Sequence, residues 1–429
     1  MKIEQLCVKR LYGDVAGATT RGHKIAIKGG YIYQTFQGGY TLTPLGWSVV
    51  HKIENIIRKE MDTVEGQEIL MPVVCSADLW RETGRYDSMD SVIAKFKGSS
   101  GADYLICPTH EEVVTDYARS VLTSYRQLPF MLYQIQTKFR NELRVRAGLI
   151  RTREFIMKDG YSFHETQGDL EKYYKRCFDA YYRLFKRCGL KNVTDVLSNT
   201  GDMGGKLAHE FQLINEMGED TLYICDCGFR ANKELEEHAS DITKCPKCGK
   251  ELQKIRGIEI GNIFQLGKKY TESMHMTYTD ANGEEKTPIM GCYGIGVTRV
   301  MAAIMEESAD ENGPIWNMET APFAVEVIGL SDKEGKTLPL AEKIYNDLHA
   351  NGIEVLLDNR DNRAGEKFAD ADLIAAPIRL IVSTKNLEQN QIEIKYRVND
   401  YDSTTLPNAI DINNYLEIIQ DLIKKLSHN

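Results

Sequence analysis

Apolar residues recur at helical spacing between residues 43 and 61, at Leu45, Val49, Ile53, Ile56, Ile57 and Met61. This spacing places the side chains on one face, so it predicts an amphipathic helix with Thr43 as its N-cap. The run EILMPVV, residues 68–74, predicts a short buried strand after that helix. Pro72 lacks the N–H that a ladder needs, which indicates a sheet edge or an interface rather than a central strand.

Two further segments have helical signals. Residues 109–125 begin with Thr109 and Glu112, whose spacing matches a capping box. Residues 168–188 form a longer periodic segment that is followed by Gly189, a residue suited to the C′ position of a helix. We therefore expect helices over both ranges.

The pattern changes at Phe323. Short β-rich runs then alternate with helical segments, in the order FAVEVIGL, LAEKIYNDLHANG, IEVLLDN, a helix near 364–375, IRLIVS, QIEIKYR and a final helix. Such alternation predicts a small α/β domain with a mostly parallel sheet, whose boundary lies near Ala321.

Length and composition indicate a large globular protein. A chain of 429 residues is long enough for two or three domains. No apolar run reaches the roughly 18 residues of a membrane span, and the start MKIEQLCVKRLYGD has no secretory pattern. We expect a cytoplasmic protein without membrane contact. The net charge of −9 argues against a generally basic surface, so any RNA contact must be local.

Arginines gather in one stretch of this acidic chain. The segment KFRNELRVRAGLIRTREFIMK contains Arg140, Arg144, Arg146, Arg151 and Arg153. Planar guanidinium groups bind phosphate oxygens in pairs, so the cluster suits a polyphosphate. A solvated charged face is the alternative interpretation, because the spacing fits neither one helix face nor one strand face.

A glycine-rich stretch, GCYGIGVTRV over 291–300, indicates a strand or turn that enters a helix and lets the backbone approach a ligand. It matches neither the phosphate-loop pattern nor the dinucleotide fingerprint. Packing is the default role of these glycines when the stretch is taken alone.

Four of the ten cysteines are clustered as a C-x-C pair and a CPKCG knuckle, namely Cys225, Cys227, Cys245 and Cys248. Such spacing predicts a tetrahedral zinc site, although the C-x-C half is tighter than usual. His238 is an alternative ligand, and a metal-free hairpin is the alternative structure. The other six cysteines are scattered and are expected to be small buried hydrophobes.

Several strings, in this order, resemble one family: MPVVCSADLWRETGRYDSM, CPTHEEVVTDYARS, YQIQTKFRNELRVRAGLIRTREFIMKDGYSFH, GGKLAHEFQLI, GNIFQLGKKYT and GCYGIGVTRV. They are similar to the bacterial-type prolyl-tRNA synthetases of class II, over roughly residues 8 to 400. The resemblance implies an α+β catalytic domain with an antiparallel sheet flanked by helices, a small zinc-ribbon-like insertion and a C-terminal α/β anticodon-binding domain. The expected ranges are 1–217 and 258–320 for the catalytic domain, 218–257 for the insertion and 321–429 for the tail.

The family's activity is implied as well. Such an enzyme uses ATP with Mg²⁺ to convert proline to prolyl-adenylate and then transfers it to tRNA(Pro). The helix and strand that end near Pro72 would build a homodimer interface. Two alternatives are a paralogue that charges a non-tRNA acceptor, which the intact tail domain disfavours, and a noncatalytic binding protein. Against the latter, Arg140, Glu142 and Arg299 are all present as expected catalytic residues.

Roles in proline binding carry over from the family position by position. Thr109 and Glu111 would hold the proline amino group, and Thr109 has the alternative role of a helix cap. Arg140 would bridge the proline carboxylate and the α-phosphate of ATP. Tyr161 is expected to line the same site.

Roles in ATP binding also carry over. Glu142 would face the adenine amino group, Arg151 the outer phosphates, and Phe155 would stack on adenine. Arg299 is expected on the nucleotide, with Glu259 and Gln265 lining the site. Family members usually have histidine where this chain has Asn262, whose role the sequence leaves open.

Two expectations concern tRNA. Many relatives carry a large editing domain between motifs 2 and 3, but only about forty residues separate Gly218 from Ile258, too few for such a domain. The chain is thus expected not to edit alanyl-tRNA and to need a separate deacylase. In the tail, resemblance assigns anticodon binding to Asp358, Arg360, Arg363 and Lys367, with an ordinary solvated loop as the alternative.

Overall fold

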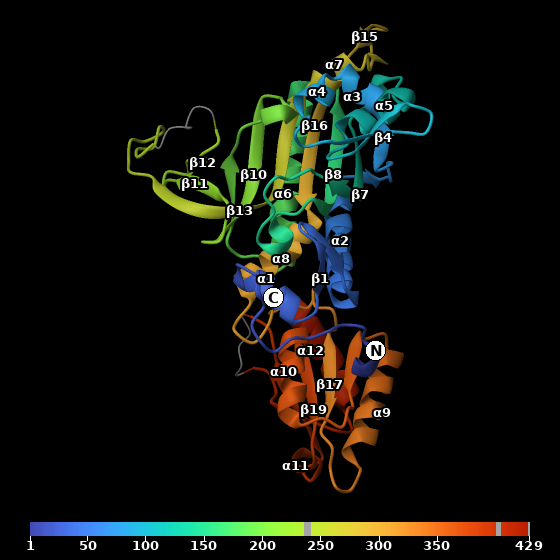
Figure 1. Ribbon diagram of the computed structural model, residues 1–429, viewed down its shortest axis with the longest axis vertical. Helices are drawn as coiled ribbons and strands as arrows, with labels where there is room; N and C mark the ends of the chain where they lie inside the picture. The colour runs from blue at the N-terminus through green and yellow to red at the C-terminus, as the bar shows by residue number, and fades with distance from the viewer. Residues whose placement is uncertain (236–241, 400–404, 428–429) are drawn as a thin grey trace. The chain divides into compact units, whose positions relative to one another are not determined.

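The computed structural model describes residues 1–235, 242–399 and 405–427 (Figure 1). It divides into two structural units. The tail unit comprises 1–36, 40–53 and 304–429, and the catalytic unit comprises 37–39 and 54–303. The N-terminal residues thus group with the tail, whereas the ranges expected from the sequence place them with the catalytic domain.

A nine-stranded sheet forms the core of the catalytic unit, in the order β10-β9-β12-β11-β13-β16-β8-β7-β3. Most neighbours are antiparallel, while β3 pairs with β7 and β12 with β9 in parallel. The strands are β3 (Gly66–Glu68), β7 (Phe130–Phe139), β8 (Glu154–His164), β9 (Val193–Leu197), β10 (Leu207–Ile214), β11 (Asp220–Ile224), β12 (Arg230–Asn232), β13 (Gln253–Gly267) and β16 (Ile289–Gly296).

Five of these strands close a ring. β10 pairs with β9 on one side and with β13 on the other, while β11 and β12 complete the circuit between β13 and β9. The long β13 makes this possible because its first part pairs with β11 and its later part with β10. The segment expected as an insertion therefore contributes two strands to the main sheet.

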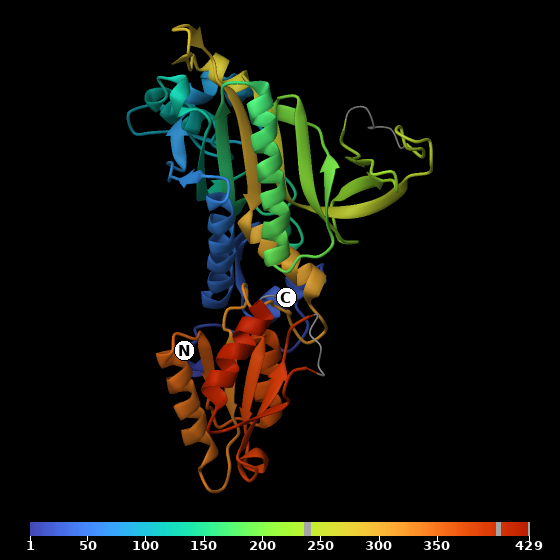
Figure 2. The same ribbon diagram turned by 180° about the vertical axis from the view of Figure 1, so that it is seen from behind.

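Helix α6 (Gln167–Arg187) lies along one face of this sheet (Figure 2). Its apolar stripe packs on the strands through Tyr181, Leu184 and Phe185, each fully buried. It ends at Cys188, and Gly189 follows with a φ of 88°. The helix and the glycine predicted at its C′ position are confirmed.

The remaining elements of the catalytic unit surround the sheet. They include a small sheet of β4 (Val74–Ser76), β5 (Ala94–Lys97) and β6 (Asp103–Ile106) and the hairpin of β14 (Tyr278–Thr279) and β15 (Glu285–Lys286). The helices are α3 (Ala77–Glu82), α4 (Arg85–Ser88), α5 (Glu111–Val121) and α7 (Lys269–Ser273), with short 3-10 turns at Tyr125–Gln127, Gly148–Ile150 and Gly201–Met203.

Two local predictions need correction. The run 68–74 is not a continuous buried strand: β3 ends at Glu68, β4 begins at Val74, and Leu70 between them is 76% exposed. The capping box at Thr109 is also absent, because α5 begins at Glu111 and Glu112 is fully buried against Arg85. In both cases tertiary contacts outweigh a local sequence signal.

The predicted helix over 43–61 is confirmed as α2 (Pro44–Asp62), and the Thr43 hydroxyl accepts a hydrogen bond from the Gly46 N–H at 3.5 Å. The glycine-rich stretch forms β16 and leads into α8 (Val297–Ser308), as predicted. A Cβ on Gly291 would approach the Tyr293 hydroxyl to 2.7 Å, so this glycine has a packing role.

In the tail unit, the sheet order is β18-β17-β19-β20-β21. The sheet is mixed: β18, β17 and β19 are parallel, as predicted, whereas β20 and β21 run antiparallel to their neighbours, which the sequence did not indicate. A short connection after β19 returns the chain in the opposite direction. The elements are β17 (Val325–Gly329), α9 (Thr337–Ala350), β18 (Val355–Asp358), α10 (Ala364–Ile374), β19 (Ile378–Val382), α11 (Thr384–Leu387), β20 (Gln391–Tyr396), β21 (Ala409–Asp411) and α12 (Tyr415–Ser427).

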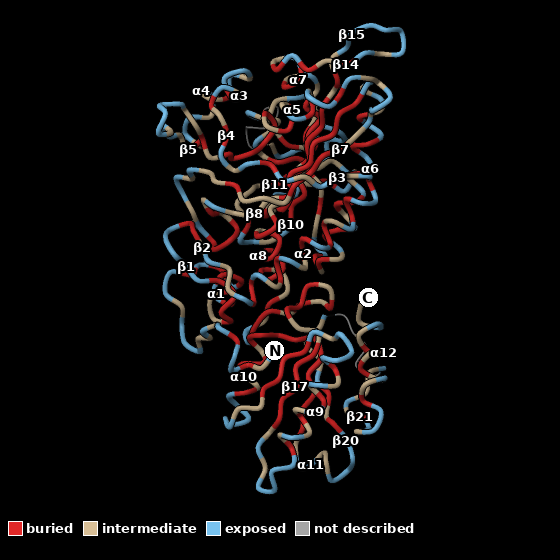
Figure 3. The backbone as a smooth tube through the Cα atoms, turned by 90° about the vertical axis from the view of Figure 1, so that its right-hand side faces the viewer, coloured by how far each residue is buried: buried red, intermediate tan, exposed pale blue. Residues whose placement is uncertain are grey.

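The N-terminal segment packs within the tail unit. It contains a 3-10 turn (Ile3–Gln5), α1 (Arg21–Lys28), β1 (Ile32–Phe36) and β2 (Gly39–Leu42). Arg10 binds Asp370, and the buried Tyr31 hydroxyl donates to the Ile374 carbonyl at 2.7 Å. Figure 3 shows the buried backbone of the strands in each unit. Among the described residues, no helix is long and apolar enough to cross a membrane.

Candidate active site

Glu111 stands at the start of α5 and is almost fully buried. Its Oε2 accepts a hydrogen bond from the Thr109 hydroxyl at 2.7 Å and lies 3.1 Å from Nη1 of Arg85. Within the described residues, Oε1 makes no hydrogen bond. The carboxylate is therefore held by one oxygen and keeps the other available.

Tyr161 supports the loop that precedes α5. Its hydroxyl accepts a hydrogen bond from the His110 N–H at 3.0 Å and donates one to Asp159 Oδ2 at 2.8 Å. Burial raises the pKa of Tyr161, so it remains a neutral donor. The Lys138 ammonium lies 2.8 Å from Asp159 Oδ1 and completes a buried network beneath the loop.

Arg140 follows β7 and is half-buried. Its Nε lies 3.4 Å from the Pro108 carbonyl, and its guanidinium is 5.2 Å from the centre of the Phe155 ring. Burial, and then the neighbouring Arg299, lowers the pKa of Arg140. Two neighbouring guanidinium groups favour the binding of a phosphate or a carboxylate.

Arg151 is held from two sides by carboxylates. Its Nε and Nη2 lie 3.0 and 2.8 Å from Glu142 Oε2, and its Nη1 lies 3.0 Å from Glu219 Oε2. Glu219 also binds Arg146, and the hydrogen bonds from these two arginines lower its pKa against the opposing effect of burial. Glu142 and Arg151, which were expected on different parts of ATP, are thus paired with each other.

Arg299, near the start of α8, contacts both β13 of the sheet and the loop that follows β7. Its Nη1 lies 3.0 Å from Glu259 Oε2, and its Nε donates to the Ile150 carbonyl at 2.8 Å. Asn262 donates to Glu259 Oε1 at 2.8 Å, which gives this unexpected residue a contact within the site. Gln265 lies further along β13, where its Oε1 accepts from Gln167 at 2.9 Å.

Further acids lie inside the ring of strands. Burial, and then repulsion from Glu259, raises the pKa of Glu210 to about 8 and that of Asp220 to about 6. Gln212 bridges the two carboxylates, donating to Glu210 at 2.9 Å and to Asp220 at 2.6 Å. The ring therefore has a polar, protonatable interior next to Glu259.

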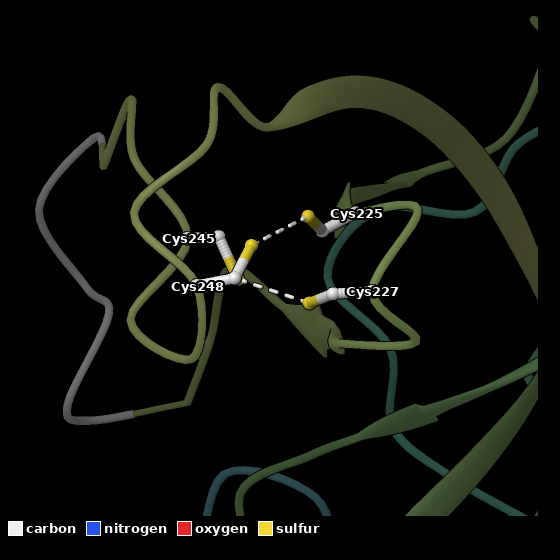
Figure 4. A group of neighbouring side chains, drawn as sticks. All are labelled: Cys225, Cys227, Cys245 and Cys248. Carbon is white, nitrogen blue, oxygen red and sulfur yellow. Dashed lines mark hydrogen bonds between the residues drawn. The ribbon is translucent and has the colours of Figure 1, made fainter.

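The four clustered cysteines converge (Figure 4). The sulfur atoms lie within 4.8 Å of one another, with Cys225 and Cys248 3.5 Å apart and Cys227 and Cys245 3.5 Å apart. Tetrahedral Zn–S bonds of about 2.3 Å require sulfurs separated by about 3.8 Å, so the geometry fits zinc. His238, the alternative ligand, lies outside the described residues.

The four tail residues are not equally placed. Asp358 and Lys367 are fully buried, and Lys367 donates to the Gly329 carbonyl at 2.6 Å. Arg360 Nη2 lies 2.7 Å from both Asp358 Oδ2 and Asp370 Oδ2. Arg363 alone of the four is exposed. Asp358, Arg360 and Lys367 therefore have evident structural partners.

Sequence reasoning missed three charged residues that organise the site: Arg85, Lys138 and Glu219. Each acts on a residue far away in the chain, so periodicity carried no signal for it. For Arg85, the string WRETGRYDSM was the available clue, because arginine stacks on aromatic rings and is the cation favoured in buried ion pairs.

Two family models match the chain. One, described as tRNA synthetase class II core domain (G, H, P, S and T), matches residues 95–308, and one described as anticodon binding domain matches residues 324–422. A proline--tRNA ligase of Endomicrobium trichonymphae is 36% identical over 521 alignment positions, covering 87% of this chain and 91% of the relative. One of Bacillus cytotoxicus is 33% identical, covering 89% and 94%.

The fold has a solved counterpart. A prolyl-tRNA synthetase of Cryptosporidium parvum, crystallised with L-proline and AMP, superposes with a TM-score of 0.74 at 17% identity. The match covers 98% of this chain and 78% of that one. The antiparallel sheet, the arginine-rich site and the tail domain define a class II aminoacyl-tRNA synthetase. Within that class, the chain belongs to the prolyl-tRNA synthetase family.

Proposed function

We propose that this protein activates proline with ATP and transfers it to tRNA(Pro). The single observation that carries the proposal is the arrangement of Glu111 and Arg140 beside the same loop, one able to receive an ammonium and the other a carboxylate. A free amino acid presents both charges on one carbon, so paired opposite charges suit it.

In the first step, a carboxylate oxygen of proline attacks the α-phosphorus of ATP, and pyrophosphate leaves. Both reactants are anions, so the reaction needs neutralisation and in-line positioning more than it needs a protein nucleophile. Arg140 would contact the carboxylate and the α-phosphate, with Arg299 beside it, and Phe155 would receive the adenine. In the second step, the 3′-hydroxyl of the terminal adenosine attacks the carbonyl, and AMP leaves.

Binding of the triphosphate would require Arg151 to exchange a carboxylate for phosphate. Its two partners, Glu142 and Glu219, hold it at the edge of the site until then. Release of Glu142 would free that carboxylate for the adenine amino group. Glu142 and Arg151 would then be paired before ATP binds and would contact adenine and the outer phosphates, respectively, after it binds.

ATP would enter with Mg²⁺, which supplies further neutralisation of the phosphates. Glu259 is the carboxylate that would hold such an ion, since carboxylate oxygens are the ligands that Mg²⁺ prefers, and it would have to exchange its contact with Arg299 or Asn262 for the ion. Gln265 and Tyr161 would line the site from β13 and β8. We propose Zn²⁺ as a structural ion at Cys225, Cys227, Cys245 and Cys248, on the strength of their convergence.

A homodimer is supported by the open edge of the catalytic sheet. β3 is the terminal strand of the order, and the segment after it exposes Leu70 by 76% and Val74 by 43%. Exposed apolar side chains beside an unpaired strand favour a protein partner. A second copy would cover both.

The tail unit would bind the anticodon. Arg363 is the expected contact that the structure leaves exposed, while Arg360, Asp358 and Lys367 would hold the surface in shape. The domain ranges 1–217, 218–257, 258–320 and 321–429 remain predictions, as does a cytoplasmic location.

Absence of editing is supported by the alignment with the Endomicrobium relative. Only about 373 residues of this chain, 87% of 429, are spread over 521 positions. The relative therefore has roughly 150 positions without a counterpart here. We propose that no second hydrolytic site exists and that a separate deacylase clears mischarged tRNA.

The proposed function is tested by proline-dependent exchange of labelled pyrophosphate into ATP, followed by charging of purified tRNA(Pro). We expect exchange with proline and charging of that tRNA. Exchange without charging would favour the paralogue with another acceptor, and absence of both would favour a noncatalytic protein.

A further inference from the structure

Arg85 is a buried cation that no step described above uses. It begins α4, and its side chain is only 2% exposed. The guanidinium carbon lies 4.8 Å from the centre of the Trp80 ring and 5.3 Å from that of Tyr270. Because aromatic rings flank the guanidinium, only the N–H groups at its edge can contact polar partners.

That edge is shared between two carboxylates. Nη1 lies 3.1 Å from Glu111 Oε2 and 3.1 Å from each oxygen of Glu112. Thr83 donates a further hydrogen bond to Glu112 Oε1 at 2.8 Å. The side chains of Glu111 and Glu112 are 2% and 0% exposed, so solvent screens neither of them.

The surrounding charges do not supply a second buried partner. Lys269 faces the cluster from α7, but its ammonium donates to the Asp202 carbonyl at 2.7 Å and remains partly exposed. Lys138 is paired with Asp159, and Tyr161 and Cys292 are neutral groups whose pKa values burial raises. Two buried carboxyl groups therefore face one buried guanidinium. Burial raises the pKa of Glu112, Arg85 acts in the opposite direction, and the neighbouring Glu111 raises it further, so one guanidinium does not fully compensate the second carboxylate.

We propose that Arg85 and Glu112 tune the carboxylate of Glu111, to which the substrate ammonium is already assigned, by leaving the three-residue cluster one positive charge short until that ammonium binds at Glu111 Oε1. Arg85 and Glu112 are positioning residues here, since only Glu111 would touch the substrate. The inference rests on the proposed activation of proline. It explains why Glu112, whose expected capping role is absent from the structure, is held in full burial beside Glu111.

The three-residue cluster should distinguish charge from shape. Tetrahydrofuran-2-carboxylate has the ring and carboxylate of proline, but an ether oxygen replaces the ammonium. Because the analogue has no positive charge, a second carboxylate does not strengthen its binding. The difference in affinity between proline and the analogue should therefore depend on Glu112. If Glu112 had only a structural role, its substitution would weaken the binding of proline and of the analogue equally.

The experiment uses the full-length protein in pyrophosphate exchange at pH 8. It compares the KM of proline with the Ki of tetrahydrofuran-2-carboxylate in Glu112→Gln. We expect the KM of proline to rise about ten- to hundredfold, as for loss of one charged interaction. The Ki of the analogue should stay within about twofold. Glu82→Gln, which changes an exposed carboxylate that pairs with Arg119, is the matched control and should change neither constant.

Arg85→Lys provides a second test, because it keeps the charge but cannot bridge both carboxylates. We expect it to raise the KM of proline about tenfold without changing the Ki of the analogue. Parallel changes in both constants, or a proline KM within twofold of wild type in Glu112→Gln, would overturn the inference. If wild type lacked proline-dependent exchange, the proposed function itself would fail instead.

Discussion

Arg140 is the side chain on which the proposed first step depends most. It lies between the loop that carries Glu111 and the ring of Phe155, and Arg299 adds a second cation nearby. No other described arginine lies beside both the Pro108 carbonyl and that ring. Its loss would leave the carboxylate and the α-phosphate to repel each other.

We predict that Arg140→Ala lowers the rate of pyrophosphate exchange by about 10²- to 10³-fold, the usual effect of removing one preorganised donor. The fold should persist, since the side chain is half-buried and makes one long hydrogen bond of 3.4 Å. Circular dichroism checks the fold, and the exposed Arg126→Ala is the control. Activity above a tenth of wild type would contradict the role.

Glu326 is a buried acid in β17, an interior strand of the tail unit's sheet. Neither of its carboxylate oxygens has a hydrogen-bond partner among the described residues. Burial raises the pKa of Glu326 to about 8, with Arg379 acting in the opposite direction. Since the folded pKa exceeds the unfolded value, the protonated form favours folding. This contribution is complete below about pH 4.5 and is lost as the pH rises toward 8.

Glu326→Gln should therefore stabilise the protein more at pH 8 than at pH 5. The expected difference in unfolding free energy is on the order of 3 kcal/mol, because Gln has no charge to bury. Thermal unfolding at the two pH values measures it, with the exposed Glu388→Gln as control. An equal effect of Glu326→Gln at both pH values would exclude a raised pKa.

At the scale of elements, the cysteine cluster joins two segments that are far apart in the chain. Cys225 and Cys227 follow β11, whereas Cys245 and Cys248 precede β13, and these two strands pair over five residues. A metal bound to all four sulfurs would fix the open ends of this strand pair. It would thereby stabilise the ring of strands beside Glu259.

We expect one zinc ion per chain in protein purified without added metal, measured by elemental analysis. Cys245→Ser should lower the zinc content and the thermal midpoint, because three thiolates bind zinc more weakly than four. Cys7→Ser changes an exposed cysteine outside the cluster and should alter neither. Wild-type protein without metal would refute the site.

The sequence predicted the long helices well. It predicted the contacts between side chains at the site poorly. The helix over 43–61 has a strong apolar period and was predicted closely. The strand over 68–74 failed because Pro72 and an exposed Leu70 interrupt it. The partners of Arg151 and Glu111 could not be predicted, because Glu219 and Arg85 reach them through folding rather than through local spacing.

For the whole molecule, the proposed absence of an editing site bears on the accuracy of charging. A site shaped for the proline ring excludes larger residues by steric clash, but alanine is smaller and must fit. Each missing methylene costs alanine only about 1 to 3 kcal/mol of binding energy. Some alanyl-tRNA(Pro) should therefore form.

We predict that the purified protein does not hydrolyse preformed alanyl-tRNA(Pro) above the spontaneous rate. A prolyl-tRNA synthetase that carries the large insertion serves as the positive control in the same assay. Release of alanine faster than in buffer would reveal a hydrolytic site in this chain.

The closed ring of β10, β9, β12, β11 and β13 bears on how such enzymes change over evolution. The chain leaves the ring after β12 and returns to it at β13. Cys225 and Cys227 lie in the turn between β11 and β12, and Cys245 and Cys248 lie shortly before β13. Lengthening a connection whose ends are already fixed costs little, since closure entropy grows only slowly with loop length. The connection between β12 and β13 can therefore change greatly in length at little cost while the ring keeps its geometry.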